Sequence, residues 1–421
     1  MSKELIIVEG GKPICGSVRI AGAKNSVLKL MAATILAPGK STITNVPIIS
    51  DVTLMGEVLA NLGAEVNFGD RQVTIDTSPI NSVHTPYELV ARMRASIAVL
   101  GPLISRFGKA HVAMPGGCQI GSRKLDMHIS GLEALGVHFE VEHGFIDASI
   151  PQGLIGAPVT LEFPSVGATE NLMMAAVRAQ GTTTIENAAR EPEIVDLGEF
   201  LIQMGAGITG LGTPIIEIEG VNELHPVATF TTIGDRIEAG TFLVAGMLGA
   251  GPLTVCGINP QHLEMALSKL KKMGAELIME NDTITISRSG TIQPADIQTL
   301  PFPGFPTDLP AQFMVLNALA EGPSVITENL FENRFVFAEE VRRMGADIRV
   351  VGHQALINGV RRLSGAPVHS PDLRGGAALV LAGLVADGQT EVSGVEHIDR
   401  GYEDFVDKLS SIGAQVKRIK T

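Results

Sequence analysis

The residues best suited to do chemistry are cations that recur at one position of a repeating chain. A glycine series recurs about every 70 residues, and one conspicuous residue stands 14 or 15 positions before each of its members. In four of six cases that residue is a cation, namely Lys24, Arg94, Arg236 or Arg374. A helix should begin there, so a cation is unfavourable unless an anion is shared nearby. Pairing with acids such as Asp235 or Asp372 would explain any single cation but not the shared position, so we predict sites for anionic ligands.

The two remaining positions of the series, Gly167 and Asp308, carry no cation. The run Ser165-Val166-Gly167-Ala168-Thr169 combines hydroxyls with glycine, as a backbone cradle for phosphate at a helix start requires. Asp308 follows a loop stiffened by three prolines. As a helix cap Asp308 would be ordinary, and as a general base it would need a substrate hydroxyl within hydrogen-bond reach. The residues alone leave that choice open.

A glycine-rich segment at residues 114–123 carries a thiol in its middle. Cys118 lies among glycines with Arg123 five positions on, which suits a cysteine that acts as an acid or a nucleophile. A buried, inert thiol is the commoner fate of cysteine. We expect that fate for Cys15 and Cys256, which lie in strand-like apolar settings.

The composition limits what the chain can bind. Its 421 residues include 32 Lys and Arg against 45 Asp and Glu, a formal net charge of −13, and 45% are hydrophobic. This favours a globular protein and argues against disorder and against coating nucleic acid or a membrane surface. The three cysteines have no ligand-like spacing, so neither disulfides nor a metal site is expected. A short apolar start and the lack of a membrane-length apolar run favour a cytoplasmic protein.

The elements that must position these residues follow from six repeats of about 70 residues. Each contains a Leu-Gly-Ala-like phrase, with its glycine at Gly63, Gly136, Gly205, Gly274, Gly345 or Gly413. In the first repeat the apolar residues of 55–62 share one helical face, Ser50 or Asp51 can cap this helix, and Gly63 can end it. Alternating apolar residues over 64–75 predict a hairpin. The repeat therefore reads β-α-β-α-β-β.

Three repeats make a domain of ordinary size, whereas one is too small to bury both of its faces. We therefore predict two hinged α/β lobes of three repeats each. The first should comprise residues 22–230, including the cysteine segment. The second should comprise residues 1–21 together with 231–421.

The chain resembles the enolpyruvyl transferase family, and within it the enzymes that act on UDP-N-acetylglucosamine. The similarity rests on motifs that follow in order along almost the full length: Ala21-Gly22-Ala23-Lys24-Asn25, Met93-Arg94-Ala95-Ser96, Gly116-Gly117-Cys118, Gly121-Ser122-Arg123, Asp126-Met127-His128, Ser165-Val166-Gly167-Ala168-Thr169, Ala189-Arg190-Glu191-Pro192-Glu193, Asp235-Arg236-Ile237-Glu238, Phe305-Pro306-Thr307-Asp308 and His397-Ile398-Asp399-Arg400-Gly401-Tyr402. The cysteine motif separates this group from its 3-phosphoshikimate-using siblings.

The resemblance implies a two-domain inside-out α/β barrel and the first committed step of peptidoglycan synthesis. Phosphoenolpyruvate and UDP-N-acetylglucosamine would give the 3-O-enolpyruvyl sugar nucleotide and phosphate by addition and elimination. No metal and no other cofactor is implied. Cations from both lobes would neutralise the two anionic substrates as the cleft closes and water is expelled.

Carried over by motif, the resemblance also gives each candidate residue a role. Cys118 would be the general acid, could carry a phosphoenolpyruvate adduct and would be the target of the epoxide fosfomycin. Asp308 would accept the proton of the sugar hydroxyl. The residues for phosphoenolpyruvate would be Lys24, Asn25, Arg123, Arg374 and Arg400, with Lys24 and Arg400 also counted as catalytic. The residues for UDP-N-acetylglucosamine would be Arg94, Arg123, Lys124, Leu125, Asp126, Met127, Ser165, Val166, Asp308 and Leu330.

Three positions depart from the family pattern, and two alternatives stay open. Lys124 stands where proline is usual, Pro310 replaces a common glutamine, and Gly375-Gly376 replaces small residues other than glycine. These differences bear on substrate geometry and not on the reaction. One alternative is enolpyruvyl transfer to another hydroxyl acceptor. The other is a silent repeat scaffold that binds a sugar nucleotide or a protein. A homo-oligomer is compatible with the sequence.

Overall fold

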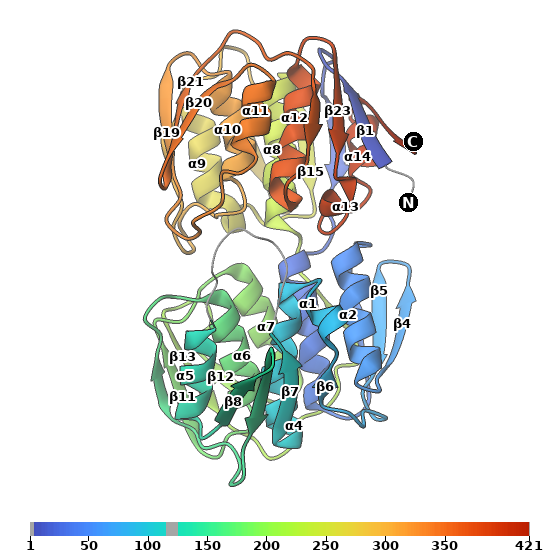
Figure 1. The fold of residues 1–421 in the computed structure, drawn as a ribbon, viewed down its shortest axis with the longest axis vertical. Coiled ribbons are helices and arrows are strands. Elements are labelled where there is room, and N and C mark those ends of the chain that lie inside the picture. The colour runs from blue at the N-terminus through green and yellow to red at the C-terminus, as the bar shows by residue number, and fades with distance from the viewer. Residues whose placement is uncertain (1–3, 115–124, 421) are drawn as a thin grey trace. The chain divides into compact units, whose positions relative to one another are not determined.

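The structure is a computed structural model that describes residues 4–114 and 125–420. The described residues form two compact units. We call residues 22–114 and 125–233 the N-unit, and residues 4–21 and 234–420 the C-unit (Figure 1). None of the helices in these ranges is both long enough and apolar enough to cross a membrane.

The C-unit contains three four-stranded sheets in its described residues. The first sheet runs in the order β16 (Glu276–Glu280), β17 (Thr283–Ser287), β15 (Leu253–Cys256), β2 (Gly16–Arg19). The second runs β18 (Ile297–Gln298), β19 (Pro323–Thr327), β21 (Gln354–Asn358), β20 (Asp347–Val351). The third runs β22 (Pro367–His369), β23 (Gln389–Ser393), β1 (Glu4–Glu9), β24 (Gln415–Lys420). The N-terminal strands β1 and β2 therefore complete sheets whose other strands come later in the chain, from residues 253–287 for β2 and from residues 367–420 for β1.

The N-unit repeats this arrangement. Its first sheet runs β14 (Phe230–Thr231), β3 (Lys40–Thr44), β5 (Gln72–Asp76), β4 (Glu65–Gly69). The second runs β6 (His84–Thr85), β7 (Lys109–Ala113), β9 (Phe145–Ser149), β8 (His138–Glu142). The third runs β10 (Pro158–Thr160), β11 (Thr182–Glu186), β13 (Ile215–Glu219), β12 (Gly207–Thr209). Every sheet contains one parallel pair and two antiparallel pairs, and in all but the third sheet of the C-unit the last antiparallel pair is a hairpin.

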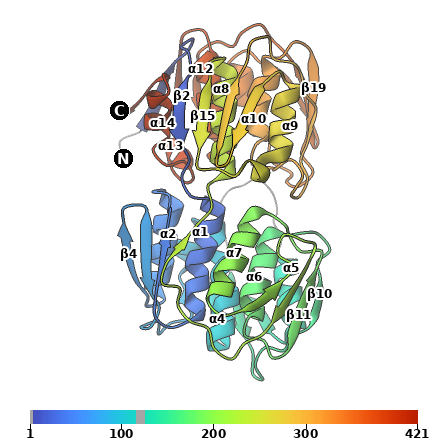
Figure 2. The same ribbon diagram turned by 180° about the vertical axis from the view of Figure 1, so that it is seen from behind.

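In each unit some helices are buried and others keep one face exposed. The helices of the C-unit are α8 (Arg236–Gly249), η3 (Pro260–Leu263), α9 (Glu264–Lys272), α10 (Pro310–Ala318), α11 (Ala338–Arg343), α12 (Leu373–Val385), α13 (Val395–Ile398) and α14 (Phe405–Ser411). Those of the N-unit are α1 (Lys24–Ala33), η1 (Thr34–Leu36), α2 (Ser50–Asn61), α3 (Tyr87–Val90), η2 (Arg94–Val99), α4 (Leu100–Phe107), α5 (Asp126–Ala134), α6 (Val166–Ala176) and α7 (Pro192–Gln203). Seen from behind, α7 lies between α1 and α6 (Figure 2).

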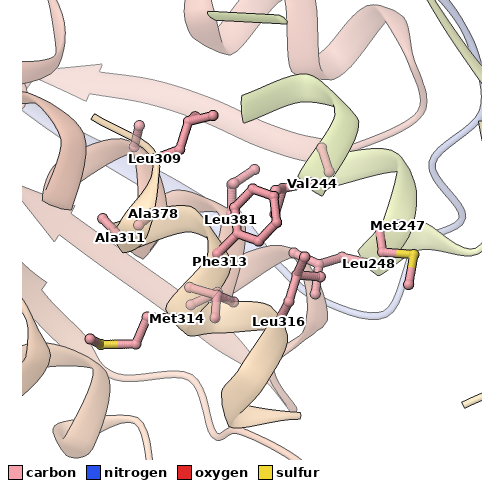
Figure 3. Packing of buried hydrophobic residues seen from close by; sticks show 14 of the residues in the cluster. Val244, Met247, Leu248, Leu309, Ala311, Phe313, Met314, Leu316, Ala378 and Leu381 are labelled. Atoms are coloured by element: carbon pink, nitrogen blue, oxygen red, sulfur yellow. The ribbon is translucent and has the colours of Figure 1, made fainter. Parts of the chain in front are cut away.

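Each unit has its own apolar core, built around the first helix of each repeat. In the C-unit, α10 is buried along its whole length, and α8 and α12 along nearly theirs. Helices that are apolar all round must lie inside a domain, so the sheets take the outer positions. Figure 3 shows Phe313 and Leu316 of α10 packed with Val244 and Leu248 of α8 and with Leu381 of α12.

The predicted fold class, an inside-out α/β barrel of two domains with six β-α-β-α-β-β repeats, is confirmed. The predicted stop at Gly63 is also confirmed, since its φ is 103°. The predicted cap at Ser50 or Asp51 is wrong, because both are helical residues and Ile49 takes the cap position without a side-chain bond. The N-unit continues to Ile233, where the prediction ended it at 230, because β14 pairs with β3.

Candidate active site

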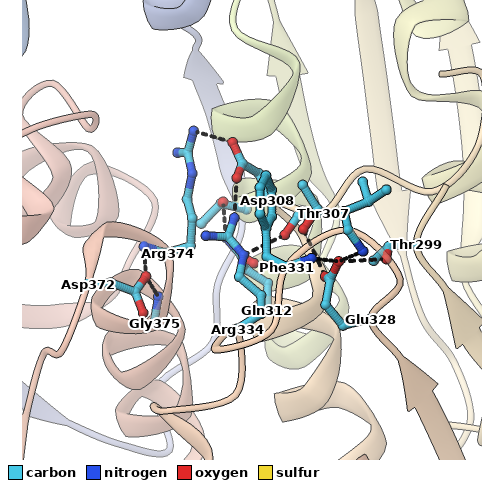
Figure 4. Close-up of polar contacts among 12 residues, drawn as sticks. Thr299, Thr307, Asp308, Gln312, Glu328, Phe331, Arg334, Asp372, Arg374 and Gly375 are labelled. Atoms are coloured by element: carbon cyan, nitrogen blue, oxygen red, sulfur yellow. Dashed lines mark hydrogen bonds and ion pairs between the residues drawn. The ribbon is translucent and has the colours of Figure 1, made fainter. Parts of the chain in front are cut away.

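The carboxylate of Asp308 is the centre of a polar cluster in the C-unit. It lies in the segment between β18 and α10, with its side chain 25% exposed. Arg334 Nη2 donates to Asp308 Oδ1, and Arg374 Nη2 donates to Oδ2 at 3.2 Å (Figure 4). The residue at the cap position of α10 is Leu309, and its side chain makes no capping hydrogen bond. The ordinary interpretation of Asp308 as a helix cap is therefore wrong.

Arg374 is the predicted cation that the structure brings to Asp308. It is the second residue of α12, and Asp372 Oδ1 accepts its backbone N–H at 2.8 Å and that of Gly375 at 3.0 Å. Asp372 thus caps the helix instead of neutralising the guanidinium. The Arg374 side chain is 4% exposed, and its Nε and Nη1 have no hydrogen-bond partner among the described residues.

The charge of Arg374 is secured by its surroundings. Its guanidinium carbon lies 5.3 Å from the centre of the Tyr402 ring. Burial by itself lowers the pKa of Arg374, but Tyr402, Asp308 and Asp235 together raise it above its ordinary value. Arg374 is therefore a permanently charged, buried group with two unused donors. Such a group is suited to bind an anion.

A side-chain amide ties this cluster to Tyr402. The nitrogen of Gln312, on α10, donates to the backbone oxygens of Asp308 at 3.2 Å and Leu309 at 3.1 Å. Its oxygen accepts from the hydroxyls of Tyr402 at 3.1 Å and Thr241 at 3.0 Å. The turn that carries Arg400 lies two residues before Tyr402, so it is held close to the same network. Sequence reasoning identified neither Gln312 nor Arg334, because no repeat position marks them.

Glycines at two unusual positions have a packing reason. A Cβ on Gly375 would lie 2.7 Å from Phe337 Cβ, and a Cβ on Gly376 would lie 2.1 Å from Ser370 Oγ. These contacts are too close for any side chain. The replacement of small residues by glycine after Arg374 therefore accompanies a close approach of α12 to its neighbours.

The other predicted cation of the C-unit helix starts is also present. Arg236 is the first residue of α8, and Asp235 caps this helix by accepting from the N–H groups of Ile237 and Glu238. The Arg236 guanidinium lies 5.7 Å from the centre of the Phe302 ring. Asp235, like Asp372, uses its carboxylate on the helix end. Pairing with Asp372 therefore does not account for Arg374, whose guanidinium contacts Asp308 instead.

In the N-unit, Lys24 has an acidic neighbour that the sequence did not indicate. Lys24 is the first residue of α1, and its Nζ lies 2.8 Å from Asp51 Oδ2 at the start of α2. Both side chains are nearly buried, at 9% and 5% exposure. Asn25 follows Lys24 and is half-buried. A cation predicted for a ligand is thus balanced by a carboxylate of its own repeat.

Some of the N-unit residues predicted for the nucleotide lie close to one histidine. Ser165 caps α6, its Oγ accepting from Ala168 N at 3.3 Å, and α5 begins at Asp126. His128 is buried, and a Cβ on Gly167 would lie 3.2 Å from its ring. Burial, together with the charge of Arg94, lowers the pKa of His128 to about 4, so its ring is neutral at physiological pH.

Six further residues were singled out by the sequence. Cys118, Arg123 and Lys124 lie outside the described residues. Leu330 is half-buried in the C-unit, in the turn after β19. Cys15 is exposed and Cys256 half-buried, so the expectation that both are buried is wrong.

Known proteins resemble this chain over its whole length. Residues 8–409 match the family model for EPSP synthase (3-phosphoshikimate 1-carboxyvinyltransferase). A UDP-N-acetylglucosamine 1-carboxyvinyltransferase of Desulfosudis oleivorans is 50% identical over 98% of this chain and 99% of that protein. One of Corynebacterium jeikeium is 52% identical over 99% of this chain and 100% of that protein.

Solved structures show the same fold. The enolpyruvyl transferase NikO from Streptomyces tendae superimposes with a TM-score of 0.89 at 26% identity, and the match covers 100% of both chains. An EPSP synthase from Acinetobacter baumannii superimposes with a TM-score of 0.77 at 18% identity, covering 99% of this chain and 100% of that one. The second similarity concerns the fold alone.

Proposed function

This chain belongs to the enolpyruvyl transferase family, and on that premise we propose that it transfers the enolpyruvyl group of phosphoenolpyruvate to the 3-hydroxyl of UDP-N-acetylglucosamine. Phosphate is the second product. The resemblance inferred from the sequence motifs is thus confirmed at the level of the family. The choice of acceptor is supported by curated relatives at 50–52% identity that carry this activity in their names. The product is the first committed intermediate of peptidoglycan synthesis.

The observation that carries the proposal is the carboxylate of Asp308 between two arginines. The two arginines fix the direction of this carboxylate, and a general base must lie within hydrogen-bond reach of the proton that it accepts. Asp308 accepts the proton of the sugar hydroxyl as its oxygen attacks C2 of phosphoenolpyruvate. Cys118 gives a proton to C3, which completes the addition. Loss of a proton from C3 and cleavage of the C2–O bond to phosphate then restore the double bond.

The cations serve the anionic substrates. Phosphoenolpyruvate is bound by Lys24, Arg123, Arg374 and Arg400, with Asn25 between it and the sugar. Arg374 supports this role best, because its Nε and Nη1 are buried and make no hydrogen bond to the described residues. Donors fixed in advance stabilise charge on the phosphate and carboxylate without reorganising during the reaction.

The nucleotide is assigned to the N-unit. Arg94, the segment from Arg123 to Met127, and Ser165 with Val166 at the start of α6 hold the uridine diphosphate. A helix start offers N–H groups and positive potential to a phosphate. Leu330 contributes to the sugar site. A cytoplasmic location, inhibition by fosfomycin through Cys118 and self-association stay predictions.

Phosphate release tests this function. The protein is mixed with phosphoenolpyruvate and UDP-N-acetylglucosamine in EDTA, and phosphate is followed with time. We expect release only with this acceptor. Release only with 3-phosphoshikimate would favour a different acceptor specificity. Binding of the nucleotide without release from any acceptor would favour the silent scaffold. Undiminished turnover in Cys118→Ser would remove that thiol from the mechanism.

A further inference from the structure

Glu328 is a buried carboxylate that the reaction scheme does not use. It directly follows β19 and is 1% exposed. Its Oε1 accepts hydrogen bonds from Thr299 Oγ1 at 2.9 Å, Leu330 N at 2.7 Å and Phe331 N at 3.2 Å. Its Oε2 accepts from Thr307 Oγ1 at 2.8 Å. Four donors from two separate segments therefore converge on one side chain (Figure 4).

The two segments are those that carry the proposed base and the proposed sugar contact. Thr307 directly precedes Asp308 in one segment. Leu330 lies in the other, four residues before Arg334. Arg334 also binds the segment of the base. Its Nε donates to Thr307 O at 2.9 Å, and its Nη2 donates to Asp308 Oδ1. Thr307 is thus held through its hydroxyl by Glu328 and through its carbonyl by Arg334.

Two further hydrogen bonds hold Thr299, at the start of the segment that leads to Asp308. Thr299 Oγ1 accepts from Asn329 N at 2.9 Å, and Asn329 Nδ2 donates to Thr299 O at 2.9 Å. Glu328 and its neighbour therefore bind both ends of the loop from Thr299 to Thr307. A loop held at both ends presents its last residue, Asp308, in one direction.

We propose that Glu328 is a positioning residue that sets the geometry between Asp308 and the segment of Leu330. The inference rests on the proposed function, because it assigns the base and the sugar contact to these two segments. A base must lie within hydrogen-bond reach of its proton, and a displacement of about 1 Å can cost on the order of 100-fold in rate. Glu328 provides that alignment without touching a substrate.

The first test compares two variants of Glu328 by steady-state kinetics. Glu328→Ala leaves four donors without their acceptor, so we expect kcat to fall about 100-fold and KM for UDP-N-acetylglucosamine to rise. KM for phosphoenolpyruvate should change less than about threefold. Glu328→Gln should restore kcat to within about fivefold of the parent, since an amide oxygen accepts the N–H groups and an amide nitrogen can donate to Thr307 Oγ1.

A matched control separates positioning from stability. Asn317 is a buried side chain of α10 that binds Ala295 N at 3.1 Å and Ala295 O at 3.0 Å, away from Asp308. Asn317→Ala should lower Tm without changing kcat or either KM of the folded enzyme. If Glu328→Ala lowers Tm in the same way and leaves kcat and both KM values unchanged, Glu328 only stabilises the fold of its loop and the proposal is overturned.

A double variant tests whether Glu328 acts through Asp308. In an Asp308→Asn background, Glu328→Ala should lower kcat by less than about threefold further, because the base that it aligns is gone. If Glu328→Ala lowers kcat by the same factor in the Asp308→Asn background as in the parent, the proposal is overturned. Should Glu328→Ala fail to fold, Thr307→Val removes the Oε2 contact alone, and we expect it to lower kcat with KM for the nucleotide unchanged. Equal constants in Thr307→Val and the parent would also count against it.

These outcomes are distinct from a failure of the proposed function. Parent enzyme that releases no phosphate with UDP-N-acetylglucosamine would contradict the proposed function. An active parent enzyme with an indifferent Glu328→Ala would contradict only the role of Glu328.

Discussion

Lys24 and Arg374 occupy equivalent positions in two repeats, yet the two units balance their charges differently. Lys24 lies 2.8 Å from Asp51, an acid of its own repeat. Arg374 shares Asp308 with Arg334, and both of these residues come from the preceding repeat. The repeat therefore determines where a helix begins and a cation stands. The acid that meets this cation is decided by tertiary packing.

The difference has a consequence for ligand binding. An anion that approaches Lys24 competes with the carboxylate of Asp51. Arg374 can bind an anion through Nε and Nη1 while Nη2 stays on Asp308. We therefore expect Arg374 to carry a larger share of the affinity for phosphoenolpyruvate, and Lys24 to depend on the balance with its partner.

Among the variants that test this comparison, Arg374→Ala should have the largest effect. It removes the two unused donors and one partner of Asp308, so kcat/KM for phosphoenolpyruvate should fall about 100- to 1,000-fold. Arg374→Lys keeps the charge but loses the planar guanidinium with its several donors. Its kcat/KM for phosphoenolpyruvate should lie between those of Arg374→Ala and the parent. Initial rates of phosphate release measure both. A kcat/KM for Arg374→Ala within threefold of the parent would show that the contrast with Lys24 has no functional meaning.

Asp51→Asn tests the other side of the comparison. Removing one member of a buried ion pair costs about 3 kcal/mol, so the variant should unfold at a clearly lower urea concentration. Because Lys24 then lacks its carboxylate, KM for phosphoenolpyruvate should not rise. Glu57→Gln is the control, since its ion pair with Arg92 is exposed and should contribute less than about 1 kcal/mol. An unchanged unfolding midpoint in Asp51→Asn would contradict the tight pairing.

Arg334→Ala tests whether the second arginine beside Asp308 aligns the base or binds phosphoenolpyruvate. It removes the bonds to Asp308 Oδ1 and Thr307 O but leaves Arg374 in place. We expect kcat to fall about tenfold through misalignment of the base, with KM for phosphoenolpyruvate within threefold. A larger rise in that KM than in Arg374→Ala would mean that the two arginines have exchanged roles.

The smallest effect concerns two buried lysine–glutamate pairs, one in each unit. Lys29 lies 3.1 Å from Glu170, and Lys408 lies 2.7 Å from Glu238. Burial raises the pKa of Glu170 and of Glu238 to about 7 in each case, from an ordinary value of about 4.5. The folded chain therefore binds more protons than the unfolded chain between these values. Their contribution to stability is full below about pH 4.5 and is lost as pH rises towards 7.

Glu170→Gln should flatten that dependence in the N-unit. The free energy of unfolding, measured with urea at pH 5, 6, 7 and 8, should decline less steeply than in the parent, by at most about 1.4 kcal/mol per pH unit. Glu238→Gln makes the same comparison in the C-unit. Identical slopes in parent and variants would contradict the buried, protonated carboxyls.

Local patterns in the sequence were enough to predict the repeat and the ends of its helices. Helical periodicity and the glycine at position 63 depend on contacts within a few residues, which sequence spacing records. The glycines that lie 14 or 15 positions after the predicted helix starts, Gly251 after Arg236 among them, show the limit, because each is expected to end a helix. At Gly251 the left-handed position is taken instead by Ala250, with φ of 59°, and nothing in the local sequence marks this shift.

The site was predicted only in part, for a physical reason. Helix starts identified Lys24 and Arg374, and the resemblance added a role for Asp308. Arg334 and Glu328 act through bonds that join separate segments, and such bonds leave no periodic signal. Asp51 was assigned to a helix cap because acids favour that place, whereas a buried lysine exerted the stronger attraction.

The most direct test of the account is the turnover of Asp308→Asn, measured beside its affinity for UDP-N-acetylglucosamine. Asparagine keeps the shape of the side chain but cannot take the proton of the sugar hydroxyl. We predict that kcat for phosphate release falls about 100- to 10,000-fold, while the calorimetric Kd for the nucleotide stays within about threefold. Turnover within threefold of the parent, at unchanged affinity, would show that Asp308 is not the base.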